Sequence, residues 1–188
     1  VKSKIKTIVD ELESEAQQIF DSVSEEYNCF RAKENAKNTI TSAIDDLINQ
    51  SLDSFETKFY YNSRDQLNRL KEEKIKEIEN ISSSTLAEVK SKTESIVNEV
   101  KSKAQQIFDS VSEEYNCFRA KENVTVSIQN DINTIIQEMI KEKLSDQEIL
   151  KKLNGLKYTA KNQIDSIGTT SMPDLRNEIE RIYAEILG

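Results

Sequence analysis

Residues 16–35 reappear without a single change as residues 104–123, which gives the chain an internal period of 88 residues. A period of this length predicts a repeat architecture, in which each repeat is one supersecondary unit that buries its apolar face against its neighbours. We therefore predict one helical repeat unit over 1–88 and a second over 89–174. Residues 175–188 match the start of a unit again, which predicts a third unit beginning there or a capping helix.

The match between the two units weakens after the identical segment, but the core spacing survives. Isoleucines recur four residues apart in both units, at Ile40, Ile44 and Ile48 and at Ile128, Ile132 and Ile136. This spacing places them on one face of a helix. Three origins of the identical segment remain open: recent duplication, deliberate placement of one segment at two positions, and a shared constraint on a binding face.

Composition restricts the chain to helices. It contains three glycines and one proline among 188 residues, with 32% charged and 36% hydrophobic residues. So few turn-forming residues and so thin an apolar fraction favour long amphipathic helices over sheets. We predict an all-α fold, either an antiparallel helical bundle or an elongated tandem repeat with coiled-coil packing.

An apolar stripe marks the first helix of each unit. From Ile5 to Phe30 apolar residues follow one another in steps of three and four, and the same pattern starts again at Val89. Amphipathic helices show this spacing. The stripe is interrupted at Lys33 and Lys37, so either the helix breaks at residues 35–38 or it continues with a polar patch facing solvent. The same alternatives apply at 122–123, and we favour a break at both places.

Later helix boundaries are predicted from capping residues. Three pairs have the spacing of a capping box: Thr85 with Glu88, Ser145 with Glu148, and Ser63 with Gln66. Asn154 with Gly155 predicts a helix end, and Pro173 predicts the first turn of a last helix.

Charge and hydropathy exclude two kinds of partner. The net charge is -8 at pH 7, which repels a phosphate backbone, and no basic cluster offsets it. Nucleic acid is therefore not an expected partner. No stretch approaches the roughly 18 apolar residues of a membrane-spanning helix, so no membrane span is expected.

The sequence offers little for catalysis. Histidine is absent, which removes the most frequent general base and zinc ligand. No phosphate-binding or calcium-binding motif occurs, and the acidic residues are interpreted as a solvated surface. We expect no enzyme activity, no catalytic residue, no metal site and no cofactor.

Two cysteines occupy the same position of the two units, Cys29 and Cys117. They are either buried, inert thiols or partners in a disulfide, within one chain or between chains. A disulfide requires an oxidising compartment. This possibility favours secretion over a cytoplasmic location, although the compartment is unknown.

Aromatic residues also recur on the stripe. They are either ordinary core residues or the lining of a site for an apolar ligand or a partner helix. The residues are Phe20, Tyr27, Phe30, Phe108, Tyr115 and Phe118.

These patterns indicate a non-enzymatic structural or interaction protein that acts as a spacer, scaffold or self-assembling unit. Its expected partners are copies of itself or other helical proteins. An alternative is a secreted carrier whose amphipathic helices hold lipid or another small apolar ligand. Lipid-surface helices usually place Lys and Arg beside a broad apolar face, whereas mixed charges border a narrow stripe here, which favours the scaffold.

Overall fold

The computed structural model describes residues 2–82, 85–144 and 146–187. Over these residues the chain forms five α-helices and no strand, which confirms the predicted all-α fold. The helices are α1 (Lys2–Ser54), α2 (Thr57–Glu79), α3 (Leu86–Lys141), α4 (Gln147–Asp165) and α5 (Met172–Leu187).

Helices α1 and α3 are long, with 53 and 56 residues. Neither contains glycine or proline, the two residues that most disfavour a helix interior. The expected breaks at 35–38 and 122–123 are wrong, since both positions lie inside α1 and α3. The lysine that interrupts each apolar stripe is not simply exposed to solvent. It binds a neighbouring loop, as described below.

The chain divides into two compact units, Val1–Phe108 and Asp109–Gly188. The division falls inside α3, so the residues of α3 up to Phe108 belong to the first unit and the remainder to the second. The sequence period instead places its boundary between residues 88 and 89. The boundary between the compact units thus lies 20 residues after the boundary between the sequence repeats, at 108 against 88.

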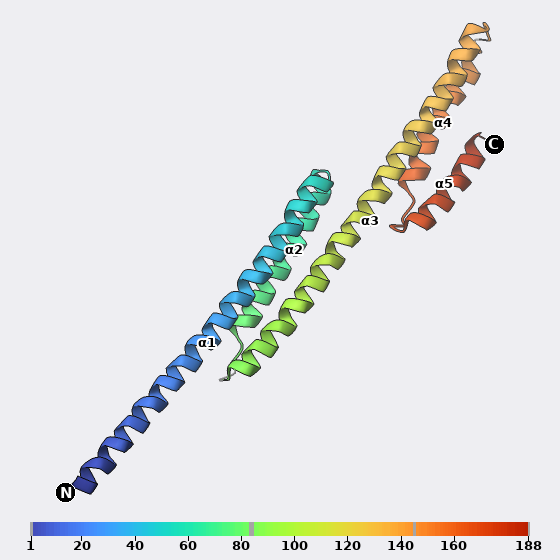
Figure 1. Ribbon diagram of the computed structural model, residues 1–188. Coiled ribbons are helices and arrows are strands. Elements are labelled where there is room, and N and C mark those ends of the chain that lie inside the picture. Colours follow the sequence, from blue (N-terminus) through green and yellow to red (C-terminus); the bar gives the residue numbers. More distant parts are fainter. Residues whose placement is uncertain (1, 83–84, 145, 188) are drawn as a thin grey trace. The chain divides into compact units, whose positions relative to one another are not determined.

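The first unit is a three-helix bundle. Helix α2 runs back along the second half of α1, and the first part of α3 packs on both (Figure 1). The core contains Ile40 and Ile44 of α1, Leu67 and Ile78 of α2, and residues of α3 that include Val100. At one end the ring of Phe55 lies 5.2 Å from that of Phe108.

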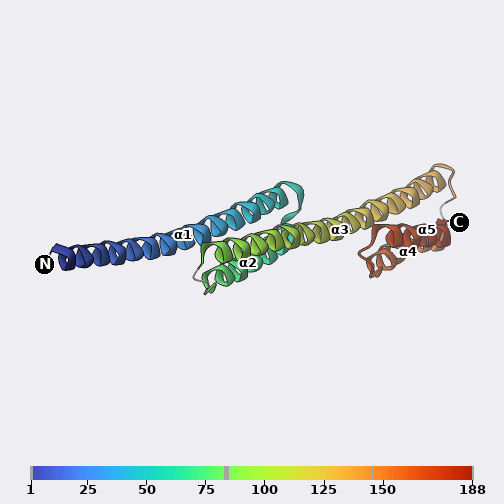
Figure 2. The ribbon, with the colours of Figure 1, turned by 60° about the horizontal axis from the view of Figure 1, so that its bottom comes forward.

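The second unit repeats this arrangement with α5 in the place of the third helix. Its core joins Ile128 and Ile132 of α3 to Ala160 and Ile164 of α4 and Ile182 of α5, and the three helices can be followed in Figure 2. The Tyr183 hydroxyl of α5 donates a hydrogen bond of 2.6 Å to Asp131 of α3. This bond raises the pKa of Tyr183 above its usual value.

Helix α4 has a defined start and a longer course than expected. Its N-cap is Asp146, whose carboxylate accepts hydrogen bonds from the backbone amides of Glu148 and Ile149, as N-cap aspartates do. The predicted cap at Ser145 lies outside the described residues. The end predicted at Asn154 and Gly155 is wrong, because leucines on both sides of them, at 150, 153 and 156, keep packing on the core.

The other boundary predictions have mixed outcomes. Thr85 immediately precedes α3, and Pro173 lies in the first turn of α5, so both are confirmed. The predicted start at Ser63 is wrong, because Ser63 lies inside α2. Its hydroxyl is buried and shares a hydrogen bond of 2.8 Å with Ser51 of α1, which satisfies a polar group that burial would otherwise penalise.

Candidate functional site

Three side chains on one face of α1 hold the segment between α2 and α3. A Glu25 carboxylate oxygen accepts a hydrogen bond of 2.6 Å from the backbone amide of Leu86, the first residue of α3. The Lys33 ammonium donates to the carbonyl oxygens of Ile81 (2.5 Å) and Glu79 (3.4 Å), at the end of α2. Cys29, midway between them, is buried.

The second unit uses the same three residues 88 positions later. Glu113 accepts a hydrogen bond of 2.9 Å from the backbone amide of Met172, the first residue of α5. The Cys117 thiol donates to the Thr170 carbonyl at 3.0 Å, and Lys121 donates to the Ile167 carbonyl. We call these two triplets, Glu25–Cys29–Lys33 and Glu113–Cys117–Lys121, the loop anchors.

Each loop anchor matches a charge to the helix end that attracts it. The free amides at a helix N-terminus carry partial positive charge and the free carbonyls at a C-terminus partial negative charge. The glutamate therefore binds the start of the following helix, and the lysine binds the end of the short helix. Both anchors lie within the identical segment, so the structure gives these positions a common packing role.

Both cysteines are buried within the loop anchors. Neither takes part in a disulfide in the described structure, and each belongs to a different compact unit. Burial raises the pKa of the Cys117 thiol, and the nearby Glu113 carboxylate raises it further. A raised pKa reduces the thiolate fraction on which reactivity depends.

A buried lysine carries the main ionic cluster of the first unit. Lys74 of α2 lies 2.7 Å from Glu77 and 3.0 Å from Glu99 of α3, and Glu99 also pairs with Lys103 at 2.6 Å. The hydrogen bonds to Glu77 and then Glu99 raise the pKa of Lys74. The bonds from Lys103 and Lys74 lower the pKa of Glu99.

The stripe aromatics differ in their exposure. Phe20, Tyr27 and Phe30 are exposed on α1, whereas Phe108 is buried in the first unit. Tyr115 is half-buried, and Phe118 is partly exposed. The same sequence position therefore has different surroundings in α1 and α3.

The first half of α1 has an exposed apolar stripe. Ile8, Leu12 and Phe20 are 55%, 59% and 67% exposed, whereas their equivalents in α3, Ile96, Val100 and Phe108, are 7%, 0% and 8% exposed. Figure 1 shows no part of the first unit beside this half of α1. We call these residues the N-terminal stripe: Ile5, Ile8, Val9, Leu12, Ile19, Phe20 and Val23.

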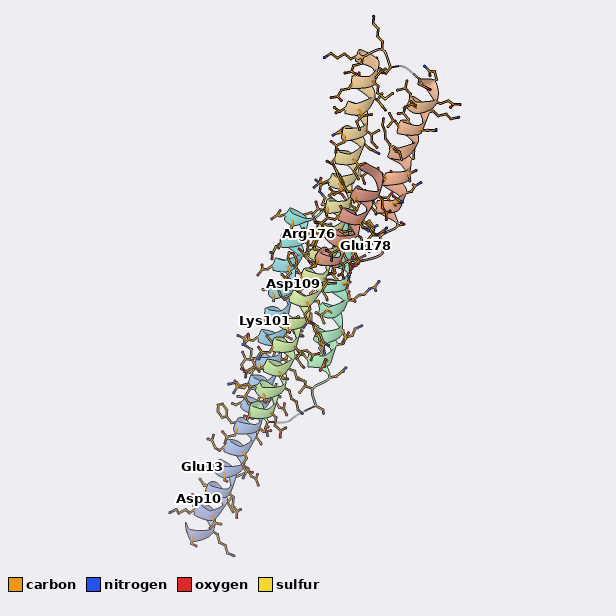
Figure 3. The ribbon with its side chains drawn as sticks, turned by 90° about the vertical axis from the view of Figure 1, so that its right-hand side faces the viewer. Asp10, Glu13, Lys101, Asp109, Arg176 and Glu178 are labelled. Carbon is orange, nitrogen blue, oxygen red and sulfur yellow. The ribbon has the colours of Figure 1, made fainter. Side chains whose placement is uncertain are left out.

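Acidic side chains flank the N-terminal stripe. Residues 5–23, which span the stripe, include five acidic residues and one basic residue, whereas the equivalent residues 93–111 include three acidic and two basic residues. Figure 3 shows Asp10 and Glu13 projecting from this half of α1. At the equivalent position of Glu13, α3 has Lys101.

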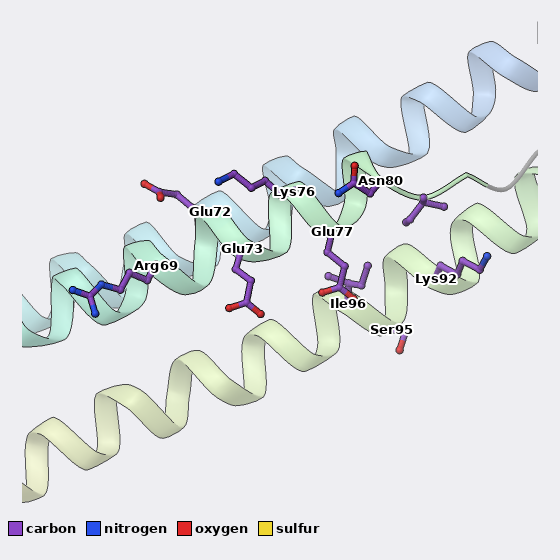
Figure 4. Close-up of a pocket in the computed structure, with 10 residues that line it drawn as sticks. Arg69, Glu72, Glu73, Lys76, Glu77, Asn80, Lys92, Ser95 and Ile96 are labelled. Atoms are coloured by element: carbon purple, nitrogen blue, oxygen red, sulfur yellow. The ribbon is translucent and has the colours of Figure 1, made fainter.

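Other surface features are less suited to chemistry. A groove of about 860 Å³ between α2 and α3 is lined mainly by charged residues, including Glu73, Glu77 and Lys92 (Figure 4). Among the described residues no cluster of His, Cys, Asp and Glu could hold a metal ion. None of the helices in the described part of the chain is long and apolar enough to cross a membrane.

The loop anchors were missed at the sequence level, although a signal was present. Glu25, Cys29 and Lys33 are spaced four apart and recur unchanged, which places one acidic, one small and one basic residue along a single helix face. Comparison with family models, with curated proteins and with solved structures gave no match.

Proposed function

We propose that this chain is a non-enzymatic structural or interaction protein, in which tandem three-helix bundles act as a spacer or scaffold. The recurrence of the loop anchor in both units carries the proposal. The glutamate and lysine of each loop anchor, and the thiol of Cys117, bind backbone groups of the chain itself.

Helix continuity supports a spacer role. Helix α3 runs through the division at Phe108 and Asp109 without interruption. Glycine and proline, the residues that most favour loops, do not occur in α3.

The distance between two spin labels, measured by electron paramagnetic resonance, tests the spacer role. Spin labels are attached at Glu72→Cys in the first unit and Lys152→Cys in the second, with Cys29 and Cys117 replaced by alanine. We expect one narrow distance distribution, and a Gly-Gly insertion after Asp109 should broaden it. A broad distribution in the chain without the insertion would contradict the proposal.

A lipid carrier is the second candidate, and the exposed N-terminal stripe is the observation in its favour. The acidic residues beside the stripe weigh against it, since lipid-surface helices carry Lys and Arg there. Organic extraction of the native protein followed by mass spectrometry distinguishes the candidates. Lipid recovered in stoichiometric amount would favour the carrier.

A further inference from the structure

We infer that the part of α1 that carries the N-terminal stripe is the third helix of a further three-helix bundle. The other two helices of that bundle form a partner hairpin, which has an aliphatic inner face and basic edges. The inference rests on the proposed function and names the chemistry of its partner. It starts from the internal repeat, because the equivalent helix of the second repeat has its apolar face packed in a core.

The covered state is the first part of α3. There Ile96, Val100 and Ala104 pack in one core with α2 and the second half of α1. Residues 36–81 thus form the hairpin on which this helix lies. The equivalent residues of α1 are Ile8, Leu12 and Ala16, and residues 16–35 are identical to 104–123. An apolar face that matches a buried one in residue type and spacing is suited to the same kind of hairpin.

Charge distinguishes the partner from this chain's own hairpin. Glu99 of α3 is neutralised from two sides, by Lys74 of the hairpin and by Lys103 of its own helix. In α1 the equivalents of Glu99 and Lys103 are Glu11 and Glu15, a like-charge pair one turn apart that disfavours the helix. Neither glutamate has a Lys or Arg three or four residues away on α1, so a partner with basic edges would supply the cations that α3 receives from Lys74 and Lys103.

The same charges argue against two other occupants. Two copies of the N-terminal stripe packed on each other would bring together five acidic residues and only one basic residue from each copy, and like charges across an interface oppose association. An anionic lipid surface would be repelled for the same reason. A basic-edged protein hairpin satisfies both the apolar stripe and its acidic border.

A fusion tests the inference on the full chain. Residues 36–88 are duplicated in front of Val1, so that the added hairpin enters α1 through the same junction by which residue 88 leads into residue 89. Amide hydrogen exchange is measured over residues 8–20. We expect exchange there to slow by about tenfold or more relative to the unfused chain, as for a helix transferred into a packed core.

Matched charge variants of the added hairpin test its edges. Glu72 and Glu73 both line the groove between α2 and α3, but Figure 4 shows Glu73 pointing toward α3 and Glu72 pointing away from it. Glu73→Lys in the added hairpin should slow exchange further, and Glu72→Lys, with the same net charge, should have a smaller effect. A fusion with Ile44→Asp and Leu67→Asp in the added hairpin should lose the protection.

Four outcomes would overturn the inference. Unchanged exchange over residues 8–20 in the fusion would exclude a hairpin partner, and equal effects of Glu73→Lys and Glu72→Lys would exclude basic edges. Light scattering that finds a dimer of the unfused chain, dissociated by Leu12→Glu, would assign the stripe to a second copy. Protection by phosphatidylglycerol vesicles would assign it to lipid. The spin-label distances between units are independent of all four outcomes.

Discussion

Lys33 donates a hydrogen bond to the carbonyl oxygen of Ile81, 48 residues further along the chain. The bond joins the middle of α1 to the end of α2, where free carbonyls carry partial negative charge. Lys121 makes the equivalent bond to Ile167 in the second unit. A lysine that interrupts an apolar stripe is therefore a structural residue of both bundles.

Replacement of this lysine should destabilise the first unit. Lys33→Met keeps most of the apolar stem but removes the charged donor, so we expect a loss of about 1–2 kcal/mol in the free energy of unfolding. Denaturant unfolding followed by circular dichroism measures it. Lys101→Met, at an exposed position of α3, is the control, and an equal effect of both changes would contradict the anchor role.

The two identical segments should exchange their amide hydrogens at different rates. Residues 104–108 pack in a core, whereas residues 16–20 have an exposed stripe, so we expect exchange at 16–20 to be faster by about 100-fold. Mass spectrometry separates the two segments when the peptides begin before Glu15 or Lys103, where their sequences differ. Equal rates would show that the stripe is covered in solution.

Glu99 should make part of the stability depend on pH. Its pKa is lowered by the hydrogen bonds from Lys103 and Lys74, so its contribution is present above the unfolded-state pKa and is lost as pH falls through the folded-state pKa. We expect Glu99→Gln to lower the melting temperature at pH 7 and to have a smaller effect at pH 3. Glu94→Gln, at an exposed position of the same helix, should show no such trend.

The thiol of Cys117 should react slowly in the folded protein. Burial raises its pKa, and both burial and a small thiolate fraction slow disulfide exchange. With Cys29 replaced by alanine, we expect reaction with dithionitrobenzoate at pH 8 to be about 100-fold slower than in denaturant. Because the raised pKa favours the protonated form, the stabilisation is present below the unfolded-state pKa and is lost as pH rises through the folded-state pKa.

Replacement of Lys143 by glycine should stabilise the protein. Its φ is 61°, a left-handed conformation in the connection between α3 and α4, which a side chain disfavours by about 1 kcal/mol. We expect Lys143→Gly to raise the free energy of unfolding by up to about 1 kcal/mol. Lys151→Gly, inside α4, should lower it by about 1 kcal/mol, and a loss in both variants would contradict the interpretation.

The spacing of the apolar residues predicted the helices because these residues recur on the helix face that is buried. The isoleucines at 40, 44, 128 and 132 are all in the cores, and the four-residue spacing alone indicated this. The expected breaks failed for a different reason. The partners of Lys33 and Lys121 are carbonyl groups 46–48 residues away, and a local pattern cannot show a contact at that separation.

The cores also could not be assigned to units from the repeat alone. A period fixes the length of a unit but not which helices pack together, and the stripe that begins at Val89 packs on residues that precede it. For the same reason the exposed state of Ile8 and the buried state of Ile96 could not be distinguished from sequence. The residue type is the same, and only the neighbours differ.

The division of the bundles inside α3 has a consequence for how such chains can evolve. A bundle takes two helices from one 88-residue period and its third from the next, so loss or gain of a whole period anywhere in a series leaves every remaining bundle with three helices. A chain cut at the sequence boundary, between residues 88 and 89, would instead leave the hairpin 36–81 without its third helix. For such a series, the length of an exchanged piece therefore matters for the integrity of the bundles, and the place where the exchange begins does not.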